Sequence, residues 1–256
     1  MRDDLGVAVA LPARVGRVVS LVPSLTEALA DVRRDALVGV TDWCTHPADL
    51  ADDPGLARVR GTKNPDVRRI VDLAPDVVVA NKEENRELDV RRLREAGVAV
   101  WVTDVVDVPG AVGSMERLLD ALGWARPSWL TRARAEWCGP VPAVRGRVVV
   151  PVWRDPWMVV GPATFTADLL RRVGLEVTGG DPATGRYPRA EAADLDAGGA
   201  DLVLLPDEPY VFTAADGPEA FTRTPTRLVS GRLLTWYGPS LGDARAHLAA
   251  ATRDLP

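Results

Sequence analysis

The segment Asn64–Asn85, NPDVRRIVDLAPDVVVANKEEN, constrains the fold more than any other stretch of this chain. Asn64 and Pro65 predict the start of a short helix, and Pro75 prevents that helix from continuing. Val77–Val79 is an uninterrupted β-branched run, which is typical of a parallel strand covered on both faces. The strand runs into a polar loop, at the edge where open α/β sheets bind ligands, made of Asn81, Lys82, Glu83, Glu84 and Asn85.

The same order of strand, helix and short loop recurs along the chain and predicts an α/β protein with parallel sheets. Strands are expected over Arg17–Val22, Ala36–Val40, Val98–Val102, Arg147–Val152, Asp201–Leu205 and Arg232–Thr235. Helices are expected over Glu84–Ala96, Val112–Leu122, Pro127–Cys138, Thr164–Val173, Ala190–Leu195 and Ser240–Ala251, with a further helix opened by a capping box at Ser24–Glu27. Ile70–Glu84 and Ala192–Pro209 share one pattern, which favours two similar lobes.

The boundary between these lobes is predicted on the helix Pro127–Cys138. This segment is not rich in Gly and Ser, as a flexible linker would be, so a rigid connector is expected. The predicted division is an N-terminal α/β lobe over residues 1–110, a helical connector over 111–144 that includes the bridging helix, and a C-terminal α/β lobe over 145–256.

Composition excludes several classes of function. The formal net charge is −5 and no basic block stands out, so a nucleic-acid partner is not expected. Cys44 and Cys138 lie far apart, and only His46 and His247 could add imidazole ligands. This scarcity argues against a disulfide framework and against a metal site built by the protein itself. No run reaches the roughly 18 apolar residues of a membrane span.

The first residues, MRDDLGVAVALPARVGR, form no recognisable secretory signal, and no lipobox cysteine follows them. As written, the chain is therefore expected in the cytoplasm. An extracytoplasmic location is expected instead if the natural start is trimmed.

Motifs for common catalytic sites do not occur. The chain has no G-x-G-x-x-G after its first strand, no G-x-x-x-x-G-K-[ST], no G-x-S-x-G and no H-E-x-x-H. Nothing pairs a nucleophile with a base, so we expect a binding protein without catalysis. The alternative is an enzyme or sensor on the same scaffold, with Glu83 or Asp42 as the acid or base.

Large aromatic side chains gather at predicted strand ends and loops, where they indicate a broad, partly apolar ligand surface. These residues are Trp43, Trp153, Trp157, Tyr187, Tyr210, Phe212, Trp236 and Tyr237. The alternative is that some of them only fill the interface between the lobes. Arg60, Lys63 and Arg154 could meet carboxylates or phosphates of a ligand, or could equally be solvated loop charges.

Five segments in this order resemble the helical-backbone metal receptor superfamily, the class III substrate-binding proteins of ABC importers for cobalamin and ferric siderophores. They are RVVSLVPSLTEAL (Arg17–Leu29), LVGVTDWCTHP (Leu37–Pro47), VRGTKNPDVRRIVDLAPDVVVANKEEN (Val59–Asn85), LREAGVAVWVTD (Leu93–Asp104) and MVVGPATFTADLLRRVGLEVTGG (Met158–Gly180).

The resemblance implies two Rossmann-like lobes bridged by a single rigid helix, with a metal chelate held between them. Cobalamin, haem or a ferric siderophore would arrive as a preformed ligand, so no cofactor of the protein's own is implied. An ABC permease would be the protein partner of a monomer, and Asp66, followed by Arg68, stands where a docking acid is expected. The positions that match the ligand-binding motifs are Pro23, Ser24, Trp43, Thr62, Lys63, Asn81, Lys82, Glu83, Trp153, Arg154, Trp157, Tyr187, Glu208, Tyr210, Trp236 and Tyr237.

Overall fold

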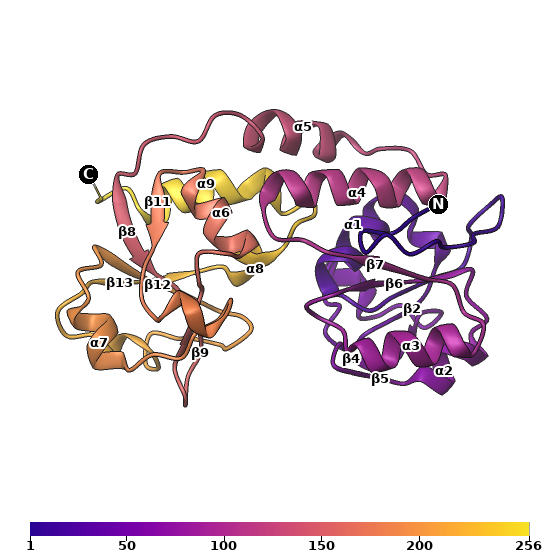
Figure 1. The fold of residues 1–256 in the computed structure, drawn as a ribbon, viewed down its shortest axis with the longest axis horizontal. Helices are drawn as coiled ribbons and strands as arrows, with labels where there is room; N and C mark the ends of the chain where they lie inside the picture. The colour runs from indigo at the N-terminus through magenta and orange to yellow at the C-terminus, as the bar shows by residue number, and fades with distance from the viewer. Residues whose placement is uncertain (256) are drawn as a thin grey trace. The chain divides into compact units, whose positions relative to one another are not determined.

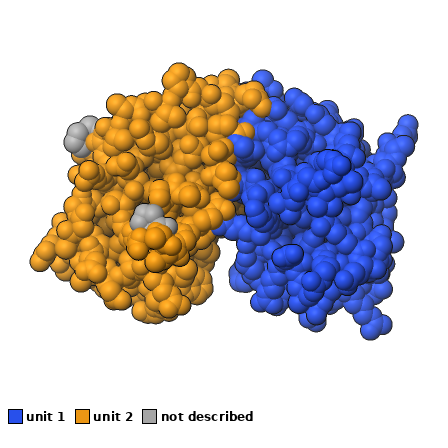
Figure 2. Space-filling model, viewed as in Figure 1, with its two compact units in different colours: residues 1–105, 110–132, 237–239 blue, residues 106–109, 133–236, 240–256 orange. Residues whose placement is uncertain are grey.

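A computed structural model describes residues 1–255 and divides into two compact units. The first unit contains residues 1–105, 110–132 and 237–239, and the second contains 106–109, 133–236 and 240–256 (Figure 2). Each unit has its own parallel sheet, so the predicted α/β class with two parallel sheets is confirmed.

The first unit is built on a five-stranded parallel sheet with the order β3-β2-β1-β6-β7. Its strands are β1 (Val18–Ser20), β2 (Leu37–Val40), β3 (Ala57–Arg58), β6 (Val77–Asn81) and β7 (Val100–Thr103). A separate antiparallel pair joins β4 (Arg60–Gly61) to β5 (Asn64–Pro65). The α-helices that carry residues of this unit are α1 (Pro23–Arg33), α2 (Val67–Asp72), α3 (Glu87–Glu95), α4 (Val108–Leu122) and α5 (Ser128–Trp137).

Strand β6 lies in the middle of the first unit's core. All five of its residues are buried, as the run Val77–Val79 predicts. Val78 and Ala80 pack with Ile70 of α2 and Leu93 of α3. The alternate residues of β6 face the other side of the sheet. In Figure 1, α1 and α4 lie on that side, and α2 and α3 on the opposite one.

The second unit has a four-stranded parallel sheet with the order β11-β8-β12-β13. Its strands are β8 (Gly146–Val149), β11 (Leu175–Val177), β12 (Leu202–Pro206) and β13 (Thr226–Val229), beside an antiparallel hairpin of β9 (Pro151–Trp153) and β10 (Met158–Val159). Its α-helices include α6 (Phe165–Arg171), α7 (Ala192–Ala197), α8 (Gly231–Thr235) and α9 (Leu241–Ala251). Short 3-10 turns occur at Arg34–Ala36, Ala48–Leu50, Pro182–Thr184 and Pro218–Ala220.

The second core repeats the arrangement of the first. Val203 and Leu205 of the fully buried strand β12 pack with Leu195 of α7 and with Phe212 and Phe221. A short helix, a turn and a buried strand therefore occur both as α2–β6 and as α7–β12. This is the repetition that the two similar sequence segments predict.

Two predicted helix starts are wrong. Asn64 and Pro65 pair with Arg60–Gly61 as β5, so the helix begins only at Val67. Its cap is Asp66, whose carboxylate accepts a hydrogen bond from the backbone N of Arg69 at 3.1 Å. Glu84 likewise precedes its helix, since the loop that follows β6 delays the start of α3 until Glu87.

The predicted capping box at Ser24–Glu27 is also wrong. Helix α1 begins one residue earlier, at Pro23, and its N-cap is Val22, which makes no side-chain capping bond. Proline at the first helical position needs no N–H partner, so this start is accommodated by the backbone alone.

The last strand was predicted over Arg232–Thr235, but those residues form helix α8. The position beside β12 is taken by β13, in which Thr226, Arg227, Leu228 and Val229 pair in parallel with successive residues of β12. The expected strand Arg147–Val152 divides into β8 and β9, and β11 was not predicted.

Two of the points where the chain passes between the units fall inside helices. They lie between Pro109 and Gly110 in α4, and between Arg132 and Ala133 in α5. Helix α4 starts at Val108, earlier than the predicted Val112, because Asp168 accepts a hydrogen bond from the backbone N of Val108 at 2.8 Å. That acceptor lies 60 residues along the chain, so no local pattern could show it.

A buried carboxylate organises the turn before β13. Asp196 of α7 is 8% exposed and accepts hydrogen bonds from the backbone N atoms of Thr222, Arg223 and Thr224. The hydroxyl of Thr222 donates to the same carboxylate at 3.1 Å. These donors, with the Thr224 N–H first, hold the pKa of Asp196 well below its usual range.

We predict that Asp196→Asn lowers the urea midpoint at pH 7. Because the pKa of Asp196 is lowered by folding, its contribution is present above the unfolded pKa of about 4 and is lost as the pH falls through the folded pKa. The difference between wild type and variant should therefore shrink below about pH 4. The control is Asp194→Asn, an exposed carboxylate of the same helix. Equal midpoints for the two variants at pH 7 would contradict this account.

Candidate functional site

The predicted ligand residues of the first unit lie on the loops that follow its strands. Pro23 and Ser24 open α1 directly after β1, and Trp43 follows β2. Thr62 and Lys63 form the turn between β4 and β5, while the Asn81–Glu83 stretch ends β6. Because β1, β2 and β6 are parallel, their carboxyl ends lie at the same edge of the sheet.

Two asparagines brace the loop after β6. The side-chain oxygen of Asn81 accepts hydrogen bonds from the backbone N of Glu83 at 2.8 Å and of Glu84 at 3.2 Å. The side-chain oxygen of Asn85 accepts from the backbone N of Asn81 at 2.9 Å. Asn85 also donates to the carbonyl of Thr62 at 2.9 Å, so the loop and the β4–β5 turn are held together. We refer below to residues Lys82, Glu83 and Glu84 as the acidic loop.

The lysines of this region are already engaged. Lys63 Nζ donates to the carbonyl oxygen of Glu83, and Lys82 Nζ lies 2.7 Å from a carboxylate oxygen of Asp104. Burial raises the pKa of the Glu84 carboxyl, nearby Lys63 opposes that effect, and the charge of Glu83 adds to it. Glu84 is thus the carboxylate of this loop whose ionisation the fold disfavours.

Tyr237 belongs to the first unit although it follows the second unit in the sequence. Its side chain is 9% exposed, and the nearby hydroxyls of Ser24 and Thr103 favour the ionised form of the phenol. Burial, followed by the charge of Glu84, raises the pKa of Tyr237. Gly238 allows this approach, since a Cβ there would lie 3.1 Å from the carbonyl oxygen of Ser24.

Among the described residues, Trp43 has the most exposed aromatic side chain, at 67%. The indole lies beside Gly61, where an added Cβ would approach Trp43 Nε1 to 3.3 Å. An aromatic ring left in water at a strand end is available for contact with another molecule.

The aromatic residues of the second unit form a connected cluster around the β9–β10 hairpin. Trp153, which is 45% exposed, meets Tyr210 edge-on with ring centroids 5.7 Å apart. Tyr210 contacts Phe212 at 4.7 Å, and Phe212 stacks on Trp157 at 5.8 Å. Phe212 is itself 3% exposed and belongs to the hydrophobic core, so its neighbours Trp153, Trp157 and Tyr210 form the accessible part.

Arg154 is enclosed by two carboxylates in the same cluster. Its guanidinium bonds to Asp216 and Glu219 and lies 5.4 Å from the ring centre of Trp157. The Tyr210 hydroxyl donates to Asp216 at 2.7 Å, which completes the network. Glu219 first, and Asp216 with it, raise the pKa of Arg154. A ligand anion would therefore have to compete with carboxylates that are already in place.

Three further candidate residues do not take part in these ring contacts: Glu208, Trp236 and Tyr187. Burial raises the pKa of Glu208, and hydrogen bonding with the Trp236 side chain opposes the rise. Trp236 is 7% exposed and has the guanidinium carbon of Arg232 5.8 Å from its ring centre. Tyr187 is half-buried, next to Arg186, whose carbonyl accepts from the backbone N of Gly161 at 2.8 Å.

The predicted residues thus fall into separate groups. In the first unit, hydrogen bonds connect Thr62, Lys63, Asn81 and Glu83, and Tyr237 lies near Ser24. In the second unit, Trp153, Arg154, Trp157 and Tyr210 form the aromatic cluster, while Glu208 pairs with Trp236. Sequence reasoning assigned no positioning role to Asn85, Asp104, Asp216 or Glu219. Asn85 lies within the predicted polar loop. The roles of Asp104, Asp216 and Glu219 depend on contacts between residues far apart in sequence.

Within the part of the chain that the structure describes, no group of three or more His, Cys, Asp or Glu side chains is placed to hold a metal ion. Over the same residues, no helix is long and apolar enough to cross a membrane. Neither Cys44 nor Cys138 is in a disulfide, and Cys44 is buried beside the hydroxyls of Thr26 and Thr41.

Three solved structures with a similar fold are described as periplasmic binding proteins. A periplasmic haem-binding protein in complex with two haems has a TM-score of 0.74 at 24% identity, covering 93% of this chain and 98% of that one. The periplasmic vitamin B12-binding protein of Vibrio cholerae has a TM-score of 0.69 at 14% identity, covering 94% and 100%. A periplasmic haem-binding protein from Pseudomonas aeruginosa has a TM-score of 0.72 at 22% identity, covering 94% of each chain.

These likenesses show the fold: the chain has the two-lobed α/β architecture of the class III periplasmic substrate-binding proteins, as its sequence resemblance predicts. Among curated proteins, a vitamin B12-binding protein from Vibrio parahaemolyticus serotype O3:K6 (strain RIMD 2210633) is 28% identical over 105 residues. That match covers 41% of this chain and 37% of the relative, so it spans little more than a third of the relative's length. No protein-family model matches the chain.

The raised pKa of Glu84 gives a test of the acidic loop. Because folding raises this pKa, the contribution of Glu84 to stability is fully present below the unfolded pKa of about 4 and is lost as the pH rises through the folded pKa. We therefore predict that Glu84→Gln is more stable than wild type at pH 7, and that the two converge below about pH 4. Urea unfolding measures both effects, with Glu87→Gln in the exposed first turn of α3 as the control. A Glu84→Gln variant less stable than wild type at pH 7 would refute this assignment.

Proposed function

We propose that this protein binds a metal chelate without catalysing a reaction, as the substrate-binding component of an ABC-type importer. The observation that carries the proposal is the exposed aromatic surface of Trp43 in one unit and of Trp153 with Tyr210 in the other. Flat aromatic faces suit the large, partly apolar rings of corrinoids and haem. Support also comes from the fold and from the partial match to a vitamin B12-binding protein.

The charges of the candidate residues favour a chelate without net negative charge. Each basic side chain among them is engaged: Lys63 by the carbonyl of Glu83, Lys82 by Asp104, and Arg154 by Asp216 and Glu219. Glu84 adds a poorly solvated carboxyl to the same loop. An anionic chelate would lose hydration without finding a free cation among these groups. We therefore place a neutral corrinoid ahead of haem, and haem ahead of an anionic ferric siderophore.

Location and partners follow the same proposal. The similar solved structures include proteins described as periplasmic, so we propose an extracytoplasmic site of action. The family resemblance places a permease contact at Asp66, whose carboxylate already has two partners. This carboxylate caps α2 and lies 3.6 Å from Arg60. The alternative is an enzyme or sensor on the same scaffold with Glu83 or Asp42 as the acid or base, and the neighbouring carboxyl whose pKa is raised by burial is that of Glu84.

Ligand binding is measured by tryptophan fluorescence during titration with cyanocobalamin, haem and a ferric siderophore. We predict saturable quenching by at least cyanocobalamin. Trp153→Phe should weaken that binding by about threefold to tenfold, the usual worth of an aromatic pair. The control is Trp124→Phe, whose indole is 7% exposed and donates to the carbonyl of Val15. Absence of saturable quenching by all three chelates would refute the proposed function.

Charge selection has its own test. Glu219→Gln removes one of the two carboxylates that enclose Arg154, so the guanidinium becomes more available to an anion. We predict that affinity for a ferric tris-catecholate rises by about threefold to tenfold, as expected for one charge-assisted hydrogen bond, while cyanocobalamin affinity is unchanged. Glu191→Gln, an exposed carboxylate before α7, is the control. Tighter wild-type binding of the tris-catecholate than of cyanocobalamin would contradict the proposed selectivity.

A further inference from the structure

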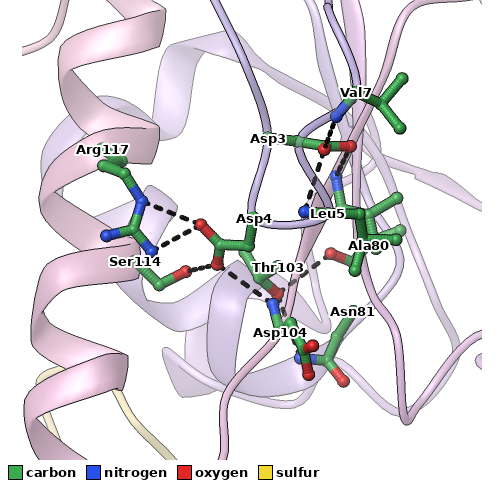
Figure 3. A network of polar contacts seen from close by, with 11 residues as sticks. Asp3, Asp4, Leu5, Val7, Ala80, Asn81, Thr103, Asp104, Ser114 and Arg117 are labelled. Atoms are coloured by element: carbon green, nitrogen blue, oxygen red, sulfur yellow. Dashed lines mark hydrogen bonds and ion pairs between the residues drawn. The ribbon is translucent and has the colours of Figure 1, made fainter.

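The residues before β1 are folded against the edge of the first unit's sheet. Arg2 and Ala8 form an antiparallel bridge, and the carboxylate of Asp3 accepts from the backbone N atoms of Leu5 and Val7, at 3.1 and 2.8 Å (Figure 3). The backbone N of Asp4 donates to the carbonyl of Val102 in β7 at 3.2 Å. This compact turn brings the side chain of Asp4 next to the end of β7.

Asp4 joins β7 to helix α4. Its carboxylate is 3% exposed and accepts from Arg117 at 2.7 and 3.0 Å and from the hydroxyl of Ser114, both on α4. It also accepts from the backbone N of Asp104, directly after β7, at 3.0 Å (Figure 3). A buried carboxylate is stable only with such a set of partners, so these bonds fix the end of β7 relative to α4.

The same end of β7 holds the acidic loop. The carboxylate of Asp104 binds Lys82 Nζ at 2.7 Å. The hydroxyl of Thr103 donates to the carbonyl of Ala80 and accepts from the side-chain nitrogen of Asn81, both at 3.1 Å (Figure 3). Asn81 in turn holds the backbone N atoms of Glu83 and Glu84. The network therefore runs from α4 through Asp4 and the end of β7 to the acidic loop.

From this network we infer that Asp4 is a positioning residue for the acidic loop. It acts on the loop through Asp104, which it holds directly, and through the neighbouring Thr103. Chelate affinity should consequently depend on a side chain at the start of the sequence, a consequence that rests on the proposed function. The ordering of the loop itself does not rest on it.

Asp3 offers a matched control. Its side chain is fully buried and pairs with Arg94 at 3.1 Å, so it resembles Asp4 in burial, charge and place in the chain. Its contacts go to its own turn, to Arg94 and to the backbone N of Val102, and none reaches Asp104 or α4. Loss of either carboxylate should destabilise the N-terminal turn, but only loss of the Asp4 carboxylate should release the loop.

Amide hydrogen exchange distinguishes these outcomes without any ligand. We expect Asp4→Asn to accelerate exchange at Glu83, Glu84 and Asp104 by about tenfold over Asp3→Asn, after correction for the unfolding free energy of each variant. Equal acceleration in the two variants, or none in Asp4→Asn, overturns the positioning role. Arg117→Gln provides a second variant that should fold, since the Arg117 side chain is 54% exposed. It should accelerate the same amides to a smaller extent, and unchanged exchange there also overturns the inference.

Binding provides the second arm of the experiment. Asp4→Asn should weaken cyanocobalamin binding by about threefold to tenfold, consistent with the loss of one positioning hydrogen bond, and Asp3→Asn should not. Weakening by Asp3→Asn to the same degree overturns the dependence on Asp4. If wild type binds none of the chelates, the proposed function fails, and exchange alone decides whether Asp4 positions the loop.

Discussion

The structure of the first unit depends on how strand β6 ends at the edge of the core. Its five residues are buried between helices on both faces of the sheet, and the last of them, Asn81, is a polar residue at 3% exposure. Asn81 meets the cost of its burial by bonding to Thr103, Glu83 and Glu84. A single side chain therefore ends the strand, joins it to β7 and shapes the loop that carries the candidate binding groups.

The two units present different chemistry on a related framework. In the first, asparagine side chains and an engaged lysine order a loop with two carboxyls. In the second, aromatic rings surround an arginine whose charge is balanced by Asp216 and Glu219. Neither surface carries an unengaged basic group among the residues proposed for binding. The proposed order of the candidate chelates therefore rests on their charge as well as on their shape.

Local sequence patterns predicted the elements whose causes are local. The valines of β6 were correctly predicted to form a buried strand. Gly97, with φ +80°, follows the C-terminal end of α3, next to the predicted helix end at Ala96. Predictions failed where distant residues decide. Asp168 extends α4 at its start, and β13 takes the place at the sheet that Arg232–Thr235 was expected to fill. The prediction at Asn64 failed for a local reason, since its pairing with Gly61 in a tight turn replaced a helical turn.

The sequence predicted that the candidate residues lie at strand ends and loops, but it could not predict which residues they contact. Strand-end residues such as Trp43 and Trp153 are exposed, as a ligand surface requires. No sequence pattern could show that Asp4 approaches Asp104, 100 residues later, or that Glu219 encloses Arg154. Those contacts determine which charges are already paired, and the proposed preference among chelates rests on them.

The central proposal is that the candidate residues of the two units bind a metal chelate. Hydrogen exchange of the protein with and without saturating cyanocobalamin tests it most directly. The account predicts that protection increases at Glu83 and Glu84 and in the hairpin around Trp153. Protection confined to other parts of the chain, with these amides unchanged, would contradict it.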